Sequence, residues 1–312
     1  MRVPRARGGC IGGSASTEIR TMQELLQYLF SGLTSGAVYA VIALGFTMLY
    51  NATGLINFAQ GEFVMLGALS LISLWKGLEL PLPVAFAGAV AAVAVVGVLL
   101  ERLAIGTVRK PHPIVLVIIT VGASIFFRGI GMMIWGKDAH SVRAFSRHAP
   151  IEIGGASLLP QSIWILAIVL LVVVWLQFFY RKTLTGKAME ASAINRKAAA
   201  LLGIGVERMT LVAFAVSAAM GALGGVLIAP ITMSSYDMGT MLGLKGFCAA
   251  MLGGLGTSWG AILGGLLLGV LESLGVGFVS SSIKDAIAFL LLLVILYLRP
   301  SGILGRRAVH RF

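Results

Sequence analysis

Five polar or ionisable residues within long apolar segments are the strongest candidates for chemistry in this sequence: Asn57, Gln60, Glu62, Lys245 and Glu272. Such groups are costly to hold in hydrocarbon and are rarely without a role. The carboxylate of Glu62 is suited to bind an ammonium group, and the amine of Lys245 is suited to bind a carboxylate. We therefore predict that Asn57, Gln60, Glu62 and Lys245 line one pathway through the molecule.

Two structural alternatives to this pathway remain open. Each charged group could extend to its nearest interface, or Glu62 and Lys245 could pair with each other. A pattern Gly-Leu-x-x-Phe occurs at both 54–58 and 243–247. It favours the pathway, because in a nine-span arrangement the two helices that carry it cross in opposite senses, as in an inverted repeat.

Nothing in the sequence supports catalysis. The stretch from Gly131 to Asp138 has the glycine and lysine spacing of a phosphate-binding loop, but Asp138 stands where Ser or Thr must bind magnesium. The four histidines lack the paired spacing of metal ligands. We therefore expect a chain that is not an enzyme, binds no metal or cofactor, and does not hydrolyse ATP itself.

The composition indicates a membrane protein. The 312 residues are 58% hydrophobic and 12% charged, with a mean hydropathy of +0.96, whereas a soluble domain carries about twice that charged fraction. A net charge of +12 would suggest nucleic acid as partner of a soluble protein. Here the basic residues lie between apolar runs, where they set the topology, so we expect a lipid bilayer and no nucleic acid.

A helix needs about 20 apolar residues to cross the hydrocarbon core. By this measure we predict an all-α bundle of eight or nine transmembrane helices. The segments are 26–50, 58–75, 81–100, 113–135, 161–180, 209–229, 241–257, 259–278 and 282–298. The second is short and partly polar, and 241–278 is rich in glycine, which fits two short spans or one span with a re-entrant segment. Residues 1–21 have no periodicity and are predicted to form a disordered tail.

Basic residues predict the orientation. The loop 181–208 holds six Lys and Arg against two Glu, and four Arg follow Leu298 without any acid, so we place both the loop and the tail 305–312 in the cytoplasm. Nine spans would put the N-terminus in the periplasm, which its own arginines oppose, so its side stays open. Glycines at four-residue spacing, such as Gly32 and Gly36, predict close helix packing within the chain or, alternatively, a subunit interface.

The loop 181–208 contains a predicted helix. Residues 187–202 are rich in Ala, Met and Leu, which are strong helix formers, and Gly203 is suited to end the helix. Such a helix could lie in the headgroup region of the membrane. It could equally dock in a groove of a cytoplasmic partner.

Several motifs resemble one family. Lys197-Ala198-Ala199-Ala200-Leu201-Leu202-Gly203 is similar to the Glu-Ala-Ala-x-x-x-Gly signature of ABC importer permeases, with Lys197 in place of Glu. The segments 32–45, 54–63, 253–261 and 299–304 are similar to branched-chain amino-acid permeases of the LivH type. These matches extend from about Met22 to Leu304, nearly the whole chain.

The resemblance implies a permease domain over 22–304 in the bacterial inner membrane. It implies four partner chains: a second permease of the same family, two cytoplasmic ATP-binding subunits and a periplasmic solute-binding protein. The signature motif implies contact with the ATPases, which we assign to Glu190, Lys197, Ala198, Ala199 and Gly203. The substrate would be a branched-chain or other small amino acid, with urea or amides as further possibilities.

A stand-alone secondary transporter driven by an ion gradient is the alternative. It would account for Glu62, Lys245 and Glu272 in apolar segments. It gives no reason for the helix in the loop 181–208.

Overall fold

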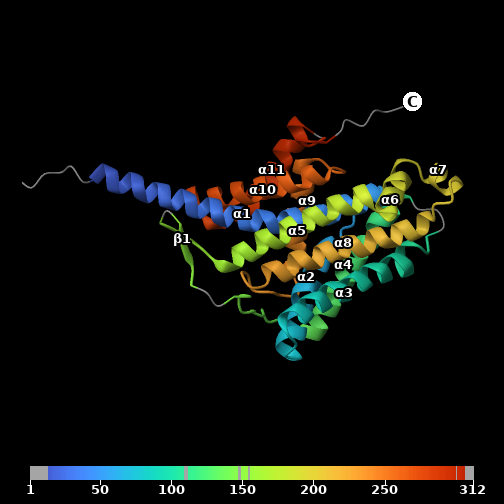
Figure 1. Ribbon diagram of the computed structural model, residues 1–312, viewed down its shortest axis with the longest axis horizontal. Coiled ribbons are helices and arrows are strands. Elements are labelled where there is room, and N and C mark those ends of the chain that lie inside the picture. The colour runs from blue at the N-terminus through green and yellow to red at the C-terminus, as the bar shows by residue number, and fades with distance from the viewer. Residues whose placement is uncertain (1–12, 109–111, 147–148, 154, 300, 306–312) are drawn as a thin grey trace, which may run out of the picture.

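The computed structural model describes residues 13–108, 112–146, 149–153, 155–299 and 301–305. Helices form most of the described chain, as Figure 1 shows. The longer ones are α1 (Gly13–Thr53), α2 (Gln60–Ile72), α3 (Leu82–Leu100), α4 (Pro113–Trp135), α5 (Pro160–Lys182), α6 (Leu184–Ile194), α8 (Val206–Ile228), α9 (Met238–Gly253), α10 (Ser258–Phe278) and α11 (Lys284–Leu298). The shorter ones are α7 (Arg196–Leu201), the π-helices η1 (Ser73–Gly77) and η2 (Glu101–Ile105), and the 3₁₀-helix η3 (Ser281–Ile283).

Seven helices in the described part of the chain are long and apolar enough to cross a membrane. They include α1, α3, α4, α5, α8 and α10, together with the segment 281–298 that contains α11. Each of the nine predicted segments contains a helix, but α2 and α9 have only 13 and 16 residues. The predicted total of eight or nine spans is therefore not confirmed.

Helix α1 begins at Gly13, so residues 13–21 of the predicted disordered tail are helical, while 1–12 lie outside the described residues. Extending an existing helix by one residue adds a hydrogen bond, whereas starting a helix is costly. This favours continuation of α1 beyond its apolar part. Of the predicted tail 305–312, only residue 305 is described.

The two ends of the bundle are clearly distinct (Figure 1). One end carries α6 and α7. The other carries an antiparallel pair of short strands, β1 (Ile151–Ile153) and β2 (Ala156–Leu158), which the all-α prediction did not include. Gln27 of α1 accepts a hydrogen bond from the Ser157 backbone of β2. The N-terminal part of α1 therefore lies at the end opposite the α6–α7 loop.

The centre of the bundle is formed by α1, α2, α8, α9 and α10, and it depends on glycine. A Cβ added at Gly36 would come within 2.9 Å of the Gly265 carbonyl oxygen, and one added at Gly32 within 2.7 Å of Val270. These two glycines thus pack α1 against α10, which confirms the prediction of close packing within the chain. Gly225 lets α8 approach the Val64 backbone of α2 in the same way.

The two short helices α2 and α9 meet at glycines. A Cβ at Gly61 would overlap the Gly239 carbonyl oxygen and would lie 2.9 Å from the Gly243 Cα. Because both neighbouring atoms belong to backbone, the helices can adapt to a side chain only by moving apart.

We expect Gly61→Ala to destabilise the protein by about 1–3 kcal/mol, the usual cost of overpacking. Gly122→Ala in α4 is the matched control, because nothing lies within 4 Å of its added Cβ. Thermal unfolding of the two variants in the same detergent measures the difference. Equal melting temperatures would contradict the packing described for α2 and α9.

Candidate functional site

Irregular backbone enters the bundle between α1 and α2. Gly54 ends α1 with a φ of +72°, a conformation that favours glycine. Residues 55–59 then run without helix, and Leu55, Asn57 and Ala59 are buried. The Phe58 backbone N–H donates to Thr120 Oγ1 in α4 at 3.2 Å. Non-helical backbone at membrane depth is tolerated only where protein or water satisfies it, so the start of α2 is a place where polar groups can be held.

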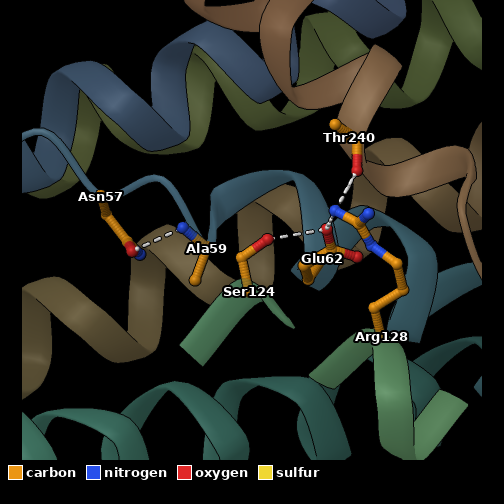
Figure 2. A network of polar contacts seen from close by, with 6 residues as sticks. All are labelled: Asn57, Ala59, Glu62, Ser124, Arg128 and Thr240. Atoms are coloured by element: carbon orange, nitrogen blue, oxygen red, sulfur yellow. Dashed lines mark hydrogen bonds and ion pairs between the residues drawn. The ribbon is translucent and has the colours of Figure 1, made fainter. Parts of the chain in front are cut away.

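Glu62, in the first turn of α2, is the centre of a polar network (Figure 2). Its Oε1 accepts hydrogen bonds from Ser124 Oγ at 3.0 Å and from Thr240 Oγ1 at 3.4 Å. Arg128 Nη2 forms an ion pair with the same oxygen at 3.3 Å and also donates to Thr240. The network therefore joins α2, α4 and α9 through one carboxylate that is 1% exposed.

The network leaves two polar atoms free. Oε2 of Glu62 and Nε of Arg128 are buried and have no hydrogen-bond partner among the described residues. The carboxylate is stabilised by the positive end of the α2 dipole as well as by the arginine. Arg128 is less enclosed than Glu62, with 35% of its side chain exposed.

Asn57 and Gln60 have mainly local structural contacts. Asn57 Oδ1 accepts a hydrogen bond from the Ala59 backbone N–H at 3.0 Å. Gln60 Nε2 donates to the Ser217 carbonyl at 2.9 Å, and its Oε1 lies 2.8 Å from Ser217 Oγ in α8. Both polar atoms of the Gln60 amide are thus engaged in holding α2 against α8. The predicted role of Asn57 and Gln60 in a pathway stays a prediction.

Lys245 belongs to a second cluster. Its Nζ lies 3.0 Å from Glu272 Oε1 in α10 and 2.7 Å from Asp285 Oδ1 at the start of α11. Tyr39 of α1 donates to the same Glu272 oxygen at 3.2 Å, and Lys284 lies 3.5 Å from it. Two lysines and two carboxylates balance each other, so the cluster connects four helices without excess charge.

Glu62 and Lys245 do not contact each other, although direct pairing of the two was one of the alternatives that the sequence left open. Each has its own partners of opposite charge, and no described hydrogen bond or ion pair joins the two. The matching pattern at 54–58 and 243–247 also lies in unlike structures, since the first is a loop and the second is inside α9. Whether Lys245 takes part in transport stays a prediction.

Arg128 was missed by the sequence analysis, although it is the closest charged partner of Glu62. The signal was present, because Arg128 is an arginine inside the predicted span 113–135 and ionisable residues in spans are functional candidates. Ser124 and Thr240 carried no such signal, since single hydroxyl residues are common in membrane helices.

The loop between α5 and α8 forms two helices, where the sequence predicted one over 187–202. Asn195 separates α6 from α7, and its side chain caps α7 by accepting from the Ala198 backbone N–H at 3.1 Å. Asn is a favoured N-cap because its side chain competes with helix continuation. Gly203 follows α7 with a φ of +81°, as predicted for a residue that ends the helix.

Most of the predicted coupling residues are at the surface of this loop. Glu190, Lys197, Ala198 and Gly203 are exposed, while Ala199 is buried. Arg196 Nη2 donates to Thr210 Oγ1 in α8 at 3.1 Å, which ties α7 to a long helix of the bundle. Leu201 and Leu202 at the end of α7 are 90% and 80% exposed. The contact of this loop with an ATPase stays a prediction.

A cleft of about 820 Å³ lies between this loop and the bundle. Its walls come from α1, α5, α6 and the start of α10, and its charged lining includes Arg181, Lys187 and Glu190. Because α6 is one wall, a movement of the loop would change the width of the cleft.

A bundle of apolar helices with charged pairs inside it and an exposed helical loop at one end is typical of a multi-span membrane protein. The family described as "Branched-chain amino acid transport system / permease component" matches residues 28–296. The chain belongs to this family, which confirms the resemblance of its motifs.

Curated relatives match along nearly the whole chain. The high-affinity branched-chain amino acid transport system permease protein LivH of Escherichia coli (strain K12) is 35% identical over 303 residues, with 92% of this chain and 97% of the relative covered. The corresponding protein BraD of Pseudomonas aeruginosa is 34% identical, with 92% and 97% covered. The ribose import permease protein RbsC of Escherichia coli is more distant, at 26% identity with 86% and 84% covered.

A solved structure supports the fold alone. PsaBC from Streptococcus pneumoniae in complex with Fab matches with a TM-score of 0.50 at 11% identity, covering 92% of this chain and 97% of the other.

We expect Lys245→Met to lower the free energy of unfolding by about 3–5 kcal/mol, because it leaves the buried Glu272 carboxylate without its nearest cation. The double variant Lys245→Met/Glu272→Met should be more stable than Lys245→Met alone, since the unpaired charge is then removed as well. Lys284→Met is the matched control, because Lys284 is half exposed and an exposed ion pair contributes about 0–1 kcal/mol. Thermal unfolding in detergent compares the stability of the three variants. Equal losses of stability for Lys245→Met and Lys284→Met would contradict a stabilising ion pair between Lys245 and Glu272.

Proposed function

We propose that this chain is a permease subunit of an ATP-binding-cassette importer that carries branched-chain amino acids across the bacterial inner membrane. The observation that carries the proposal is the family match over residues 28–296, together with relatives named for branched-chain amino acid transport that are covered to 97%. The basic loop 181–208 supports a cytoplasmic position for α6 and α7. The start of α1, at the opposite end of the bundle, would then face the periplasm.

The energy for transport would come from partner subunits. The sequence has no complete phosphate-binding loop, since Asp138 replaces the required Ser or Thr. We propose two cytoplasmic ATPases, a second permease of the same family and a periplasmic solute-binding protein as the partners. ATP itself would be bound and hydrolysed by the ATPases.

The α6–α7 loop is the proposed contact with an ATPase. Exposed large apolar groups at Ile194, Leu201 and Leu202 suit burial in the groove of a partner. Glu190, Lys197, Ala198, Ala199 and Gly203 would form and shape this contact, with Ala199 packed toward the bundle. The hydrogen bond from Arg196 to Thr210 would transmit movement of α7 to α8.

Asn57, Gln60, Glu62 and Lys245 are the proposed pathway residues of the chain. Glu62 and Asn57 have the best support among them, because Oε2 of Glu62 and Nδ2 of Asn57 are buried and have no hydrogen-bond partner among the described residues. Lys245 is already paired with two carboxylates. A stand-alone transporter driven by an ion gradient is left without support from the relatives, and it does not account for the exposed apolar end of α7.

Co-purification tests the assembly. We expect the tagged protein, expressed in its native host and extracted in mild detergent, to retain two ATPases and a second permease, identified by mass spectrometry. A chain that purifies alone and still transports in ATP-free liposomes under an ion gradient would contradict the proposal.

We expect Leu201→Asp to reduce the recovery of the ATPases about tenfold, which corresponds to about 1.4 kcal/mol of lost binding free energy. A charge at this position would have to be buried unpaired in the contact. Met233→Asp is the matched control, because Met233 is an exposed apolar residue in the loop between α8 and α9, away from the α6–α7 loop. Equal recovery of the ATPases with both variants would show that Leu201 is not at the contact.

A further inference from the structure

Arg128 lies at hydrocarbon depth and is still partly exposed. It is seven residues from the end of α4 at Trp135, or about 10 Å along the helix axis, and about 22 Å from the other end. It therefore falls within the roughly 30 Å hydrocarbon core. An arginine that faces lipid at this depth is costly, so its exposed 35% indicates a surface that meets water or protein instead of lipid.

The same surface is apolar on both sides of the arginine. Residues at spacings of three and four share one face of a helix, and Val121, Ile125 and Met132 share this face with Arg128. All three are exposed, and Ile125, the nearest, is 65% exposed. We call Val121, Ile125, Arg128 and Met132 the α4 face.

In the ion pair between Glu62 and Arg128, each side chain keeps one polar atom without a hydrogen-bond partner among the described residues. The acid keeps a free acceptor, Oε2 of Glu62, and the base keeps a free donor, Nε of Arg128 (Figure 2). Buried polar atoms without partners are rare and call for an explanation. A ligand with one ammonium group and one carboxylate carries a donor suited to Oε2 of Glu62 and an acceptor suited to Nε of Arg128.

We propose that Glu62 and Arg128 bind the ammonium and carboxylate groups of an α-amino acid as it passes along the α4 face, with its apolar side chain against Ile125. This inference rests on the proposed function and names the residues that recognise its substrate. The α4 face then borders a water-filled pathway that the second permease closes. The inference adds Arg128, which lies outside the sequence motifs described above.

The electrostatics favour a zwitterion over a singly charged ligand. Glu62 and Arg128 together carry no net charge, and a zwitterion adds none. When the ligand binds, the ion pair between Glu62 and Arg128 is replaced by two ion pairs, one from each residue to the ligand. A singly charged ligand would instead leave one buried charge without compensation, which is strongly unfavourable. The guanidinium can also bind a carboxylate through two parallel hydrogen bonds.

Thiol labelling tests whether the α4 face meets water. In a chain with Cys10 replaced by Ser, we expect Ile125→Cys to react with a charged, membrane-impermeant methanethiosulfonate at least tenfold faster than Leu171→Cys. Leu171 in α5 is the matched control, because it is 68% exposed and makes no described ion pair. The parent chain, whose Cys248 is buried, sets the background. Equal rates for the two variants would overturn the proposal.

Transport by the complete complex in proteoliposomes tests the recognition itself. We expect Glu62→Gln and Arg128→Gln each to lower leucine uptake at least tenfold, while ATP hydrolysis stimulated by the loaded binding protein stays within twofold of wild type. Glu101→Gln is the matched control, because Glu101 is a buried carboxylate outside this network and its uptake should remain within twofold. Uptake by both network variants within twofold of wild type, or a parallel loss of uptake, hydrolysis and assembly, would overturn the proposal.

The same measurements separate this inference from the proposed function. A wild-type complex that takes up no branched-chain amino acid refutes the proposed function, and the labelling of Ile125→Cys still decides whether the α4 face meets water. A wild-type complex that transports, with variants that do so equally well, refutes only the recognition by Glu62 and Arg128.

Discussion

The cost of an unpaired polar group in hydrocarbon is the constraint on which this structure depends. Water cannot satisfy backbone or charged groups at membrane depth, so the chain must supply partners itself. Helices do this for most of the described backbone. The buried part of the segment 54–59 is not helical, and the Phe58 N–H there donates to Thr120. The charged side chains follow the same rule, because Glu62 is paired with Arg128, and Lys245 with two carboxylates.

These two charged clusters also decide which helices stay together. Glu62 connects α2, α4 and α9, and Lys245 connects α9 with α10 and α11. In lipid, apolar side chains provide little drive for helices to associate, so close backbone packing and polar contacts provide it instead. Glycines bring α1 to α10 and α2 to α9, and the ion pairs then hold the more peripheral α4 and α11. Helix α9 contributes residues to both clusters, so a shift of this helix would change the distances between the charged groups in both.

The α6–α7 loop lies outside this core, and most of its residues are exposed. Its turn depends on Asn195, whose side chain caps the second helix, and on Gly203, whose positive φ ends it. The leucines after the turn remain exposed, whereas leucines in the centre of the bundle such as Leu44 are fully buried. An exposed apolar end on a helix that is tied to α8 is suited to receive movement from a partner and pass it into the bundle.

The sequence by itself determined the membrane class, the approximate positions of the apolar helices and the family, because hydrophobic runs and local motifs are properties of neighbouring residues. It also placed Glu62 and Lys245 among the polar residues of apolar segments. It did not determine their partners. Glu62 and Arg128 are 66 residues apart, and Lys245 and Asp285 are 40 apart, so only the crossing of helices brings them together. The break at Asn195 and the unpaired atoms of Glu62 and Arg128 likewise depended on three-dimensional packing, because a residue's environment in the bundle is set by helices distant in the sequence.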